Sequence, residues 1–179
     1  MNWWNAPAYK VAKFLINILK SYATLPYTVN VKNMKQLLLG IQRISFDGEL
    51  KSTSSDITDS YTNVPNKKVR EIIHDIFIKN YFNQRIKKEI LDICDVIIWQ
   101  NYYYFFFWKL LYTQKSLSHG APTSSILSEL YIQHVEHTLF SPILRKCRIL
   151  GYFRYVNDIL IIYKHWKPGL PSTHCPFTS

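Results

Sequence analysis

Three short segments of the sequence carry polar side chains whose types and spacing could do chemistry. Asp56 ends a stretch with strand character, and Gly120 and Pro122 come just before an apolar helical stretch. Asn157 and Asp158 lie between two apolar stretches. A strand end, a helix start and a hairpin can converge on one site. Acidic side chains gathered there would be hard oxygen ligands, which suits metal-assisted chemistry.

The first segment is SDITDSYTNVP, which begins at Ser55. Asp56 is followed five residues later by Tyr61, and this pattern resembles motif A of reverse transcriptases. In that family the aspartate holds magnesium ions, aided by the main-chain carbonyl of the next residue, which is Ile57 here. The aromatic side chain lies under the sugar and selects deoxynucleotides. Taken singly, the segment is equally compatible with an aspartate that caps a helical turn.

The second segment, GAPTSSILS, begins at Gly120 and resembles motif B. In that family the glycine lets the backbone approach the templating base and the incoming nucleotide, because no side chain intervenes. The helical continuation ELYIQ, from Glu129, also resembles retroelement polymerases, whereas His119 departs from their usual Gln or Met. Physical chemistry alone would favour a simpler interpretation, a helix that starts at Pro122 with hydroxyl groups in its first turn.

The third segment, GYFRYVNDILIIY, begins at Gly151 and resembles motif C. The usual form of this motif is an aromatic residue, a variable residue and two aspartates between apolar strands. Tyr155 fits the aromatic position, but Asn157 replaces the first aspartate, so only Asp158 is acidic. An asparagine carbonyl can coordinate a metal ion but brings no charge to offset two nearby cations. We therefore predict impaired catalysis.

Together, the three segments resemble the reverse transcriptase domain of a retroelement, of the Penelope-like or a related non-LTR type. The resemblance implies an RNA-directed DNA polymerase that uses two Mg²⁺ ions, an RNA template, a DNA primer and dNTPs. It assigns catalysis to Asp56, Asp158 and the degenerate position Asn157, and metal binding to Asp56, Ile57 and Asp158. It assigns nucleotide and template contacts to Tyr61, Gly120, Ala121, Pro122 and Tyr155.

The resemblance extends from about Trp4 to Lys164. It implies a partial reverse transcriptase domain over residues 1–164, with the palm and part of the fingers, followed by an irregular tail over residues 165–179. Amino-terminal fingers segments and the thumb have no counterpart in the sequence. We therefore expect a truncated polymerase with a weak grip on its template.

Composition is consistent with this interpretation. The chain has 179 residues, 47% of them hydrophobic, and a formal charge of +10, which favours a polyanionic partner such as nucleic acid. We find no signal peptide, and the apolar run Val96–Tyr112 is interrupted by polar residues, so we expect an intracellular protein, nuclear or cytoplasmic, without a membrane partner. Cys94, Cys147 and Cys175 show neither disulfide nor zinc-site spacing and are predicted to be reduced thiols.

Periodicity predicts the elements that must position these residues. Helices are expected over residues 9–23, 31–42, 65–79, 85–98 and 122–144. Strand character is expected up to Asp56, over residues 101–112, and over residues 147–155 and 159–164, with Asn157 and Asp158 at the bend of the last hairpin. The predicted class is α+β: a polymerase palm with a small antiparallel sheet and packed helices.

Weaker candidates remain beside this site. His134 and His137 lie on one expected helix without a third metal ligand, which favours ordinary solvated or packed histidines. Ser124 and Ser125 lack the elbow motif of a serine nucleophile, so helix capping is the better interpretation. The aromatic run Phe105–Trp108 could stack on bases but is more typical of a core strand.

Three functions are therefore open. The first is an RNA-directed DNA polymerase fragment, impaired by Asn157 and by truncation. The second is a catalytically inactive nucleic-acid-binding remnant of the same fold. The third is an unrelated basic α+β interaction domain, which would bring no cluster of Asp56, Tyr61 and Asp158 together.

Overall fold

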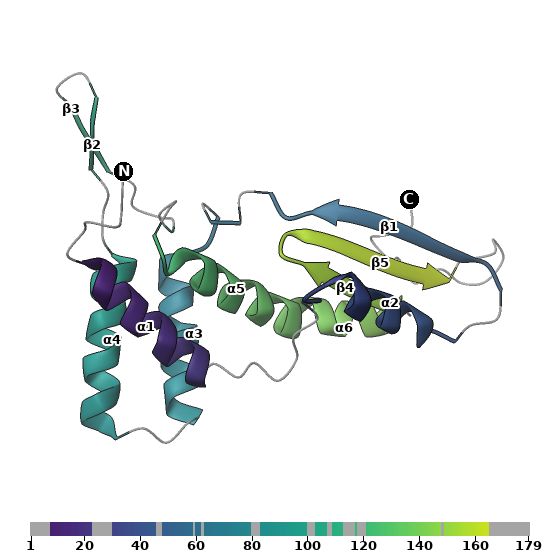
Figure 1. The fold of residues 1–179 in the computed structure, drawn as a ribbon, viewed down its shortest axis with the longest axis horizontal. Coiled ribbons are helices and arrows are strands. Elements are labelled where there is room, and N and C mark those ends of the chain that lie inside the picture. The colour runs from purple at the N-terminus through teal and green to yellow at the C-terminus, as the bar shows by residue number, and fades with distance from the viewer. Residues whose placement is uncertain are drawn as a thin grey trace. The chain divides into compact units, whose positions relative to one another are not determined.

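The computed structural model describes most of the chain as two compact units. Described are residues 8–22, 30–45, 48–58, 60–61, 63–79, 83–99, 103–106, 109–112, 117, 121–147 and 149–164. The helical unit comprises Met1–Pro26 with Asp59–His134, and the sheet unit comprises Tyr27–Thr58 with Val135–Ser179. Figure 1 labels the helices and strands of both units.

The helical unit is built on four helices: α1 (Ala8–Tyr22), α3 (Asn66–Lys79), α4 (Gln84–Ile98) and α5 (Ser124–Val135). A short antiparallel hairpin, β2 (Tyr103–Phe106) and β3 (Lys109–Tyr112), follows α4. One face of each helix is apolar and enters a shared core. The core includes Ala12, Leu15 and Leu19 of α1, Val69, Ile73 and Phe77 of α3, Ile90, Leu91, Cys94, Ile97 and Ile98 of α4, and Leu127 and Leu130 of α5.

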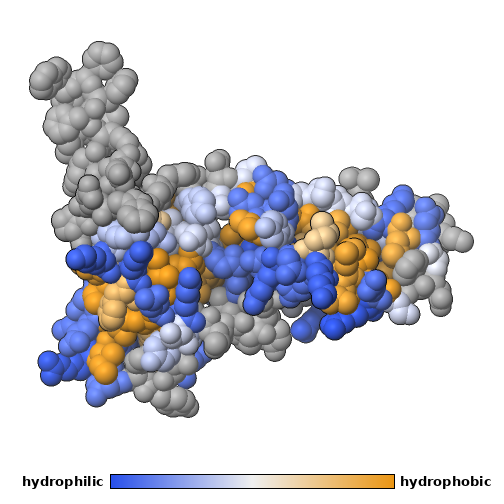
Figure 2. Space-filling view, in the orientation of Figure 1, coloured by the Kyte–Doolittle hydropathy of each residue, from blue (hydrophilic) through white to orange (hydrophobic). Residues whose placement is uncertain are grey.

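Polar contacts fix the antiparallel pairing of α3 and α4. The Arg70 guanidinium donates to both carboxylate oxygens of Asp95, from Nε at 2.6 Å and from Nη2 at 2.9 Å. The buried Asn66 side chain donates to the Ile98 carbonyl oxygen at 3.2 Å, which joins the start of α3 to the end of α4. Asn83 caps α4 by accepting from the Arg85 N–H. Figure 2 shows apolar surface gathered over α1 and its neighbouring helices, bordered by polar side chains.

The sheet unit contains three antiparallel strands in the order β1–β5–β4 (Figure 1). Their bounds are β1 Leu50–Asp56, β4 Ile149–Tyr155 and β5 Asp158–Lys164. The unit also holds α2 (Met34–Gln42), the π-helical turn η2 (Glu136–Phe140) and α6 (Ser141–Lys146). The central strand β5 is the most apolar of the three, and its Ile159, Ile161 and Ile162 are buried.

Two glycines allow the close packing of Phe153 in the sheet unit. A Cβ atom on Gly40 of α2 would lie 2.5 Å from Cε1 of the Phe153 ring. A Cβ atom on Gly151 would lie 2.8 Å from Cε2 of the same ring and 2.6 Å from Cδ1 of Ile44. Because real Cβ atoms do not approach so closely, a Cβ atom on Gly40 would force the Phe153 ring to shift, and one on Gly151 would also displace Ile44.

The α+β class and nearly all predicted elements are confirmed. The expected helices correspond to α1, α2, α3, α4 and the α5–η2–α6 run, and the expected strands to β1, to β2 with β3, and to β4 and β5. α2 begins at Met34 rather than Val31, because the Asn33 side chain accepts from the Gln36 N–H and caps the helix there. The long helix predicted over residues 122–144 contains the π-helical turn η2.

Two expectations were wrong. The bend of the last hairpin consists of Val156 and Asn157, and Asp158 is already the first residue of β5, because a two-residue turn lets Asp158 pair with Tyr155. Cys147 is disulfide-bonded rather than reduced, whereas Cys94 is a free, buried thiol. The predicted tail over residues 165–179 lies outside the described residues. In the described part of the chain, no helix is both long enough and apolar enough for a membrane span.

Candidate functional site

The sheet unit places Asp56 opposite Asp158. Asp56 is the last residue of β1 and Asp158 the first of β5, and the two form a cross-strand pair in the antiparallel register. Both side chains are exposed. Because directly paired residues point to the same face of a sheet, the two carboxylates lie side by side at one end of it. The sequence analysis assigned both aspartates to one site, and the register of β1 and β5 places them opposite each other.

A hydrogen bond next to this pair defines its type. The Ile57 N–H donates to the Asn157 carbonyl oxygen at 2.9 Å. Hydrogen-bonded and non-hydrogen-bonded pairs alternate along an antiparallel ladder. Asp56 and Asp158 are therefore a non-hydrogen-bonded pair, the kind in which the Cα atoms come within about 4.5 Å and the side chains are closest.

Two carboxylates on directly paired residues of a sheet repel each other. Like charges about 4 Å apart repel by about 1 kcal/mol even in bulk water, and by more where the solvent is partly displaced. Among the ion pairs found between described residues, neither Asp56 nor Asp158 takes part. A divalent cation would offset this repulsion, so the pair suits a hard cation such as Mg²⁺. Within the described residues no group of three or more His, Cys, Asp or Glu could hold a metal ion, so among these residues the candidate site consists of the Asp56 and Asp158 carboxylates.

Asn157 lies in a strained turn. Val156, the residue before it, has a φ of 54°, a left-handed value that a β-branched side chain rarely adopts. Such a conformation costs about 1–3 kcal/mol and persists only where the surroundings enforce it. The side chain of Asn157 is half-buried beside the aspartate pair. The turn therefore presents a neutral amide where motif C normally has a second carboxylate.

The remaining motif residues lie in two places. Tyr155 ends β4, is exposed and is paired with Asp158. Ile57 follows β1 and is tied to the turn by its N–H. The sheet unit therefore gathers every residue that the resemblance assigned to catalysis and metal binding, together with Tyr155.

The other assigned residues belong to the helical unit. Ala121 and Pro122 are half-buried at the start of α5, and Gly120 lies outside the described residues. The Tyr61 carbonyl oxygen accepts from the Leu117 N–H at 3.1 Å, and the Ser128 hydroxyl of α5 donates to the Ser60 carbonyl oxygen at 2.8 Å. These bonds tie residues 60 and 61 to Leu117 and to α5.

The weaker candidates gain no support as sites. Ser124 is buried in the first turn of α5, and its N–H donates to the Ala121 carbonyl oxygen, as expected of a residue at a helix start. His134 and His137 join no group of three metal ligands among the described residues. The side chains of Phe105–Trp108 lie outside the described part of the structure.

A buried polar network under the turn was not predicted from the sequence. Arg154 of β4 is fully buried and pairs with Glu136 of η2, with Nε 2.6 Å from Oε1 and Nη2 3.2 Å from Oε2. The Tyr152 hydroxyl also donates to Glu136 Oε1, at 3.0 Å. Burial raises the pKa of Tyr152, and the Glu136 carboxylate beside it raises this pKa further. The sequence feature that could have indicated this network is Arg154, a charged residue within an expected strand just before the hairpin turn.

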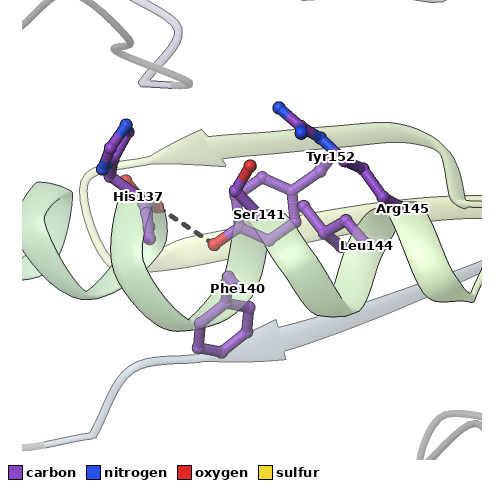
Figure 3. Close-up of a pocket in the computed structure, with 7 residues that line it drawn as sticks. His137, Phe140, Ser141, Leu144, Arg145 and Tyr152 are labelled. Carbon is purple, nitrogen blue, oxygen red and sulfur yellow. Dashed lines mark hydrogen bonds between the residues drawn. The ribbon is translucent and has the colours of Figure 1, made fainter.

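The network borders a small pocket. The pocket has a volume of about 230 Å³ and lies between Tyr152 of β4 and side chains of η2 and α6, including His137, Phe140 and Arg145 (Figure 3). The Tyr152 hydroxyl points toward η2, where its hydrogen bond to Glu136 is drawn. Both Glu136 oxygens already accept hydrogen bonds from within the unit. The part of the wall formed by Glu136 and Tyr152 therefore belongs to a structural network.

Comparison with known proteins gave matches only among solved structures. No family model and no curated protein matches the chain. Apo telomerase from Candida tropicalis matches with a TM-score of 0.61 and 13% identity, over 89% of this chain and 31% of that one. The same telomerase truncated from its C-terminal domain matches with a TM-score of 0.58 and 15% identity, over 89% and 34%.

A third structure is telomerase from Candida albicans in complex with the TWJ fragment of telomeric RNA. It has a TM-score of 0.56 and 15% identity, and the match covers 87% of this chain and 30% of that one. The chain therefore spans about a third of the length of these telomerases. At such low identity the likeness bears on the fold alone. This chain has an α+β, reverse-transcriptase-like polymerase fold.

Proposed function

We propose that this chain is an RNA-directed DNA polymerase domain of retroelement type whose metal site is weakened. The observation that carries the proposal is the pairing of Asp56 with Asp158 at the end of the sheet. Two facing carboxylates without a cationic partner among the described residues are poorly explained as a device for stability. They are well explained as one side of a cation site in a polymerase fold.

In this proposal Asp56, Asp158 and the main-chain carbonyl of Ile57 hold Mg²⁺. When bound, magnesium lowers the pKa of the primer 3′-hydroxyl and offsets charge on the triphosphate. The carboxylates fix that chemistry to one end of the sheet, and the exposed Tyr155 provides an aromatic surface beside them. Asn157 supplies an oxygen without a charge, so the site holds its cations more weakly than one with a third carboxylate.

The proposed partners are an RNA template, a DNA primer and dNTPs. The formal charge of +10 supports a polyanionic partner, and one of the similar telomerases is in complex with an RNA fragment. Tyr61, Gly120, Ala121 and Pro122 are the proposed nucleotide and template contacts, as in motifs A and B. The retroelement origin is supported by the likeness of the motif B segment and its helical continuation from Glu129 to retroelement polymerases.

The test is primer extension on an RNA template with the purified chain and Mg²⁺. Asn157→Asp restores a third carboxylate and should raise incorporation by at least tenfold, since each ~1.4 kcal/mol of transition-state stabilisation is worth a factor of ten. Asp56→Ala in that background should abolish incorporation. Asn17→Asp, which adds the same charge on an exposed position of α1, is the matched control and should change nothing. Absence of incorporation from both the unmodified chain and Asn157→Asp would refute the proposed activity.

A second function is favoured by one observation, the replacement of a carboxylate by Asn157. In this alternative the chain binds nucleic acid through its basic surface without catalysis. It predicts binding whose affinity falls steeply with salt, as expected when phosphate contacts release counterions. It also predicts that Asn157→Asp gains no incorporation. An unrelated interaction domain, the third possibility, is disfavoured by the reverse-transcriptase-like fold and by the Asp56–Asp158 pair.

A further inference from the structure

A buried cation holds the turn that carries Asn157. Arg154 has no exposed surface, and its Nη1 donates to the Val156 carbonyl oxygen at 2.8 Å. The main chain of Arg154 is also anchored, because its carbonyl oxygen accepts from the Val31 N–H at 2.7 Å. The left-handed Val156 is thus tied directly to a guanidinium that is itself fixed inside the unit.

The guanidinium is fixed by its two neighbours. Glu136, which is only 7% exposed, binds it through both carboxylate oxygens. Tyr152 donates its hydroxyl to the same carboxylate. Charge-assisted and two-pronged hydrogen bonds of this kind restrict orientation as well as adding energy. A continuous set of hydrogen bonds thus links Glu136 of η2, through the Arg154 side chain, to the main chain of the turn.

The turn needs this external hydrogen bond because Val156, one of its two residues, disfavours the left-handed conformation that the turn requires. Glycine is the usual residue at a positive φ in a two-residue hairpin turn, and Val156 is β-branched. Without an external hydrogen bond, the turn would relax toward shapes that valine prefers. Relaxation would move the first residue of β5, Asp158, relative to Asp56.

We infer that Arg154, held by Glu136 and Tyr152, is a positioning residue that fixes the Val156–Asn157 turn and thereby keeps Asp158 opposite Asp56. The role in catalysis rests on the proposed function, whereas the role in holding the turn does not. The ordinary alternative is that the ion pair serves only the stability of the unit. Buried ion pairs are often replaceable by apolar residues without loss of stability, so the two roles can be separated.

The decisive variant replaces both charges together, Glu136→Leu with Arg154→Met, in the Asn157→Asp background. It keeps side-chain volume and removes the donor to Val156. The matched control is Arg145→Met, which removes an exposed guanidinium from α6 near the same pocket. Hydrogen exchange is measured at the Ile57 amide, whose acceptor is the turn residue Asn157, and at the mid-strand Ile161 amide. Primer extension is measured on the same proteins.

A positioning role predicts that exchange at Ile57 accelerates at least tenfold while exchange at Ile161 changes less than threefold. Incorporation should fall at least tenfold, with the unfolding midpoint nearly unchanged. Equal acceleration at both amides, or none at Ile57, overturns the inference. If the double variant does not fold, Tyr152→Phe decides, because it removes one hydroxyl and leaves the ion pair. It should accelerate exchange at Ile57 alone, by about twofold to fivefold, and unchanged exchange there overturns the inference.

The two proposals fail separately. If Asn157→Asp incorporates no nucleotide but the double variant still frees the Ile57 amide, the proposed activity is lost and the holding of the turn stands. If incorporation is present and the double variant changes neither amide, the activity stands and Arg154 has no positioning role.

Discussion

Asp56 and Asp158 form a directly opposed cross-strand pair, in the closest type of pairing that an antiparallel sheet allows. Residues 102 positions apart in the chain thus present two carboxylates to the same solvent-facing end of the sheet, as the numbering shows. Such a pair is unfavourable by itself and becomes favourable with a cation. Removal of one of the two carboxylates should therefore raise the stability of the cation-free chain and weaken cation binding.

Asp158→Asn should stabilise the chain in the absence of divalent cations. Removing one of two facing charges should raise the free energy of unfolding by about 0.2–1 kcal/mol. The same substitution should abolish any rise in melting temperature on addition of millimolar Mg²⁺. Glu49→Gln, an equal change of charge at an exposed residue just before β1, is the control. A loss of stability in Asp158→Asn without cations would contradict the repulsion.

Val156→Gly should stabilise the hairpin. Val156 has a φ of 54°, and relief of this strain, about 1–3 kcal/mol, should exceed the entropic cost of glycine, about 0.5–1 kcal/mol. Urea unfolding should show a gain of roughly 1 kcal/mol. Val156→Ala, which keeps the Cβ atom, should show a smaller gain, and an equal gain from both variants would argue against strain at this residue.

Gly40→Ala should destabilise the sheet unit. The new methyl group would lie 2.5 Å from Cε1 of Phe153, and overpacking of this kind costs about 1–3 kcal/mol. Gly48→Ala is unsuitable as a control because Gly48 has a φ of 116°. The better control is Phe153→Leu combined with Gly40→Ala, which removes the ring. The double variant should recover part of the loss, measured by chemical unfolding, and strict additivity would contradict a clash.

The buried thiol of Cys94 should make stability depend on alkaline pH. Burial raises the pKa of Cys94 from its ordinary value of 9.0 to about 12, with Asp95 adding to the effect. The pKa of Cys94 is higher in the folded chain than in the unfolded chain. The thiol's contribution to the free energy of unfolding is therefore complete below about pH 9 and is lost as the pH rises toward 12. The free energy of unfolding should fall with a slope of up to about 1.4 kcal/mol per pH unit from this group.

The measurement is the slope of unfolding free energy between about pH 9 and pH 11 for the unmodified chain and for Cys94→Ala, in the window between the ordinary and raised pKa. The difference between the two slopes isolates the thiol from the tyrosines and lysines that titrate in the same range. Identical slopes would show that the thiol is accessible to ionisation in the folded chain. The absolute stability of Cys94→Ala is not informative, because the substitution also leaves a small cavity.

The sequence by itself determined the secondary structure and the identity of the candidate site. Apolar residues at helical spacing predicted α1, α3 and α4, because a helix that buries one face has apolar residues at the helical period. The strand end at Asp56 and the hairpin around Asn157 followed from local residue types. The neutral side chain of Asn157 beside Asp158 was also visible, because charge is a property of the residue alone.

Only the tertiary structure decided how these residues meet. The register that sets Asp56 against Asp158 depends on long-range pairing, and a shift by one residue would turn one of them to the opposite face. The left-handed Val156 has no signal in the sequence, because valine disfavours that conformation. Arg154 and Glu136 are charged residues that local patterns assign to the surface, yet they are buried because each neutralises the other in the folded unit.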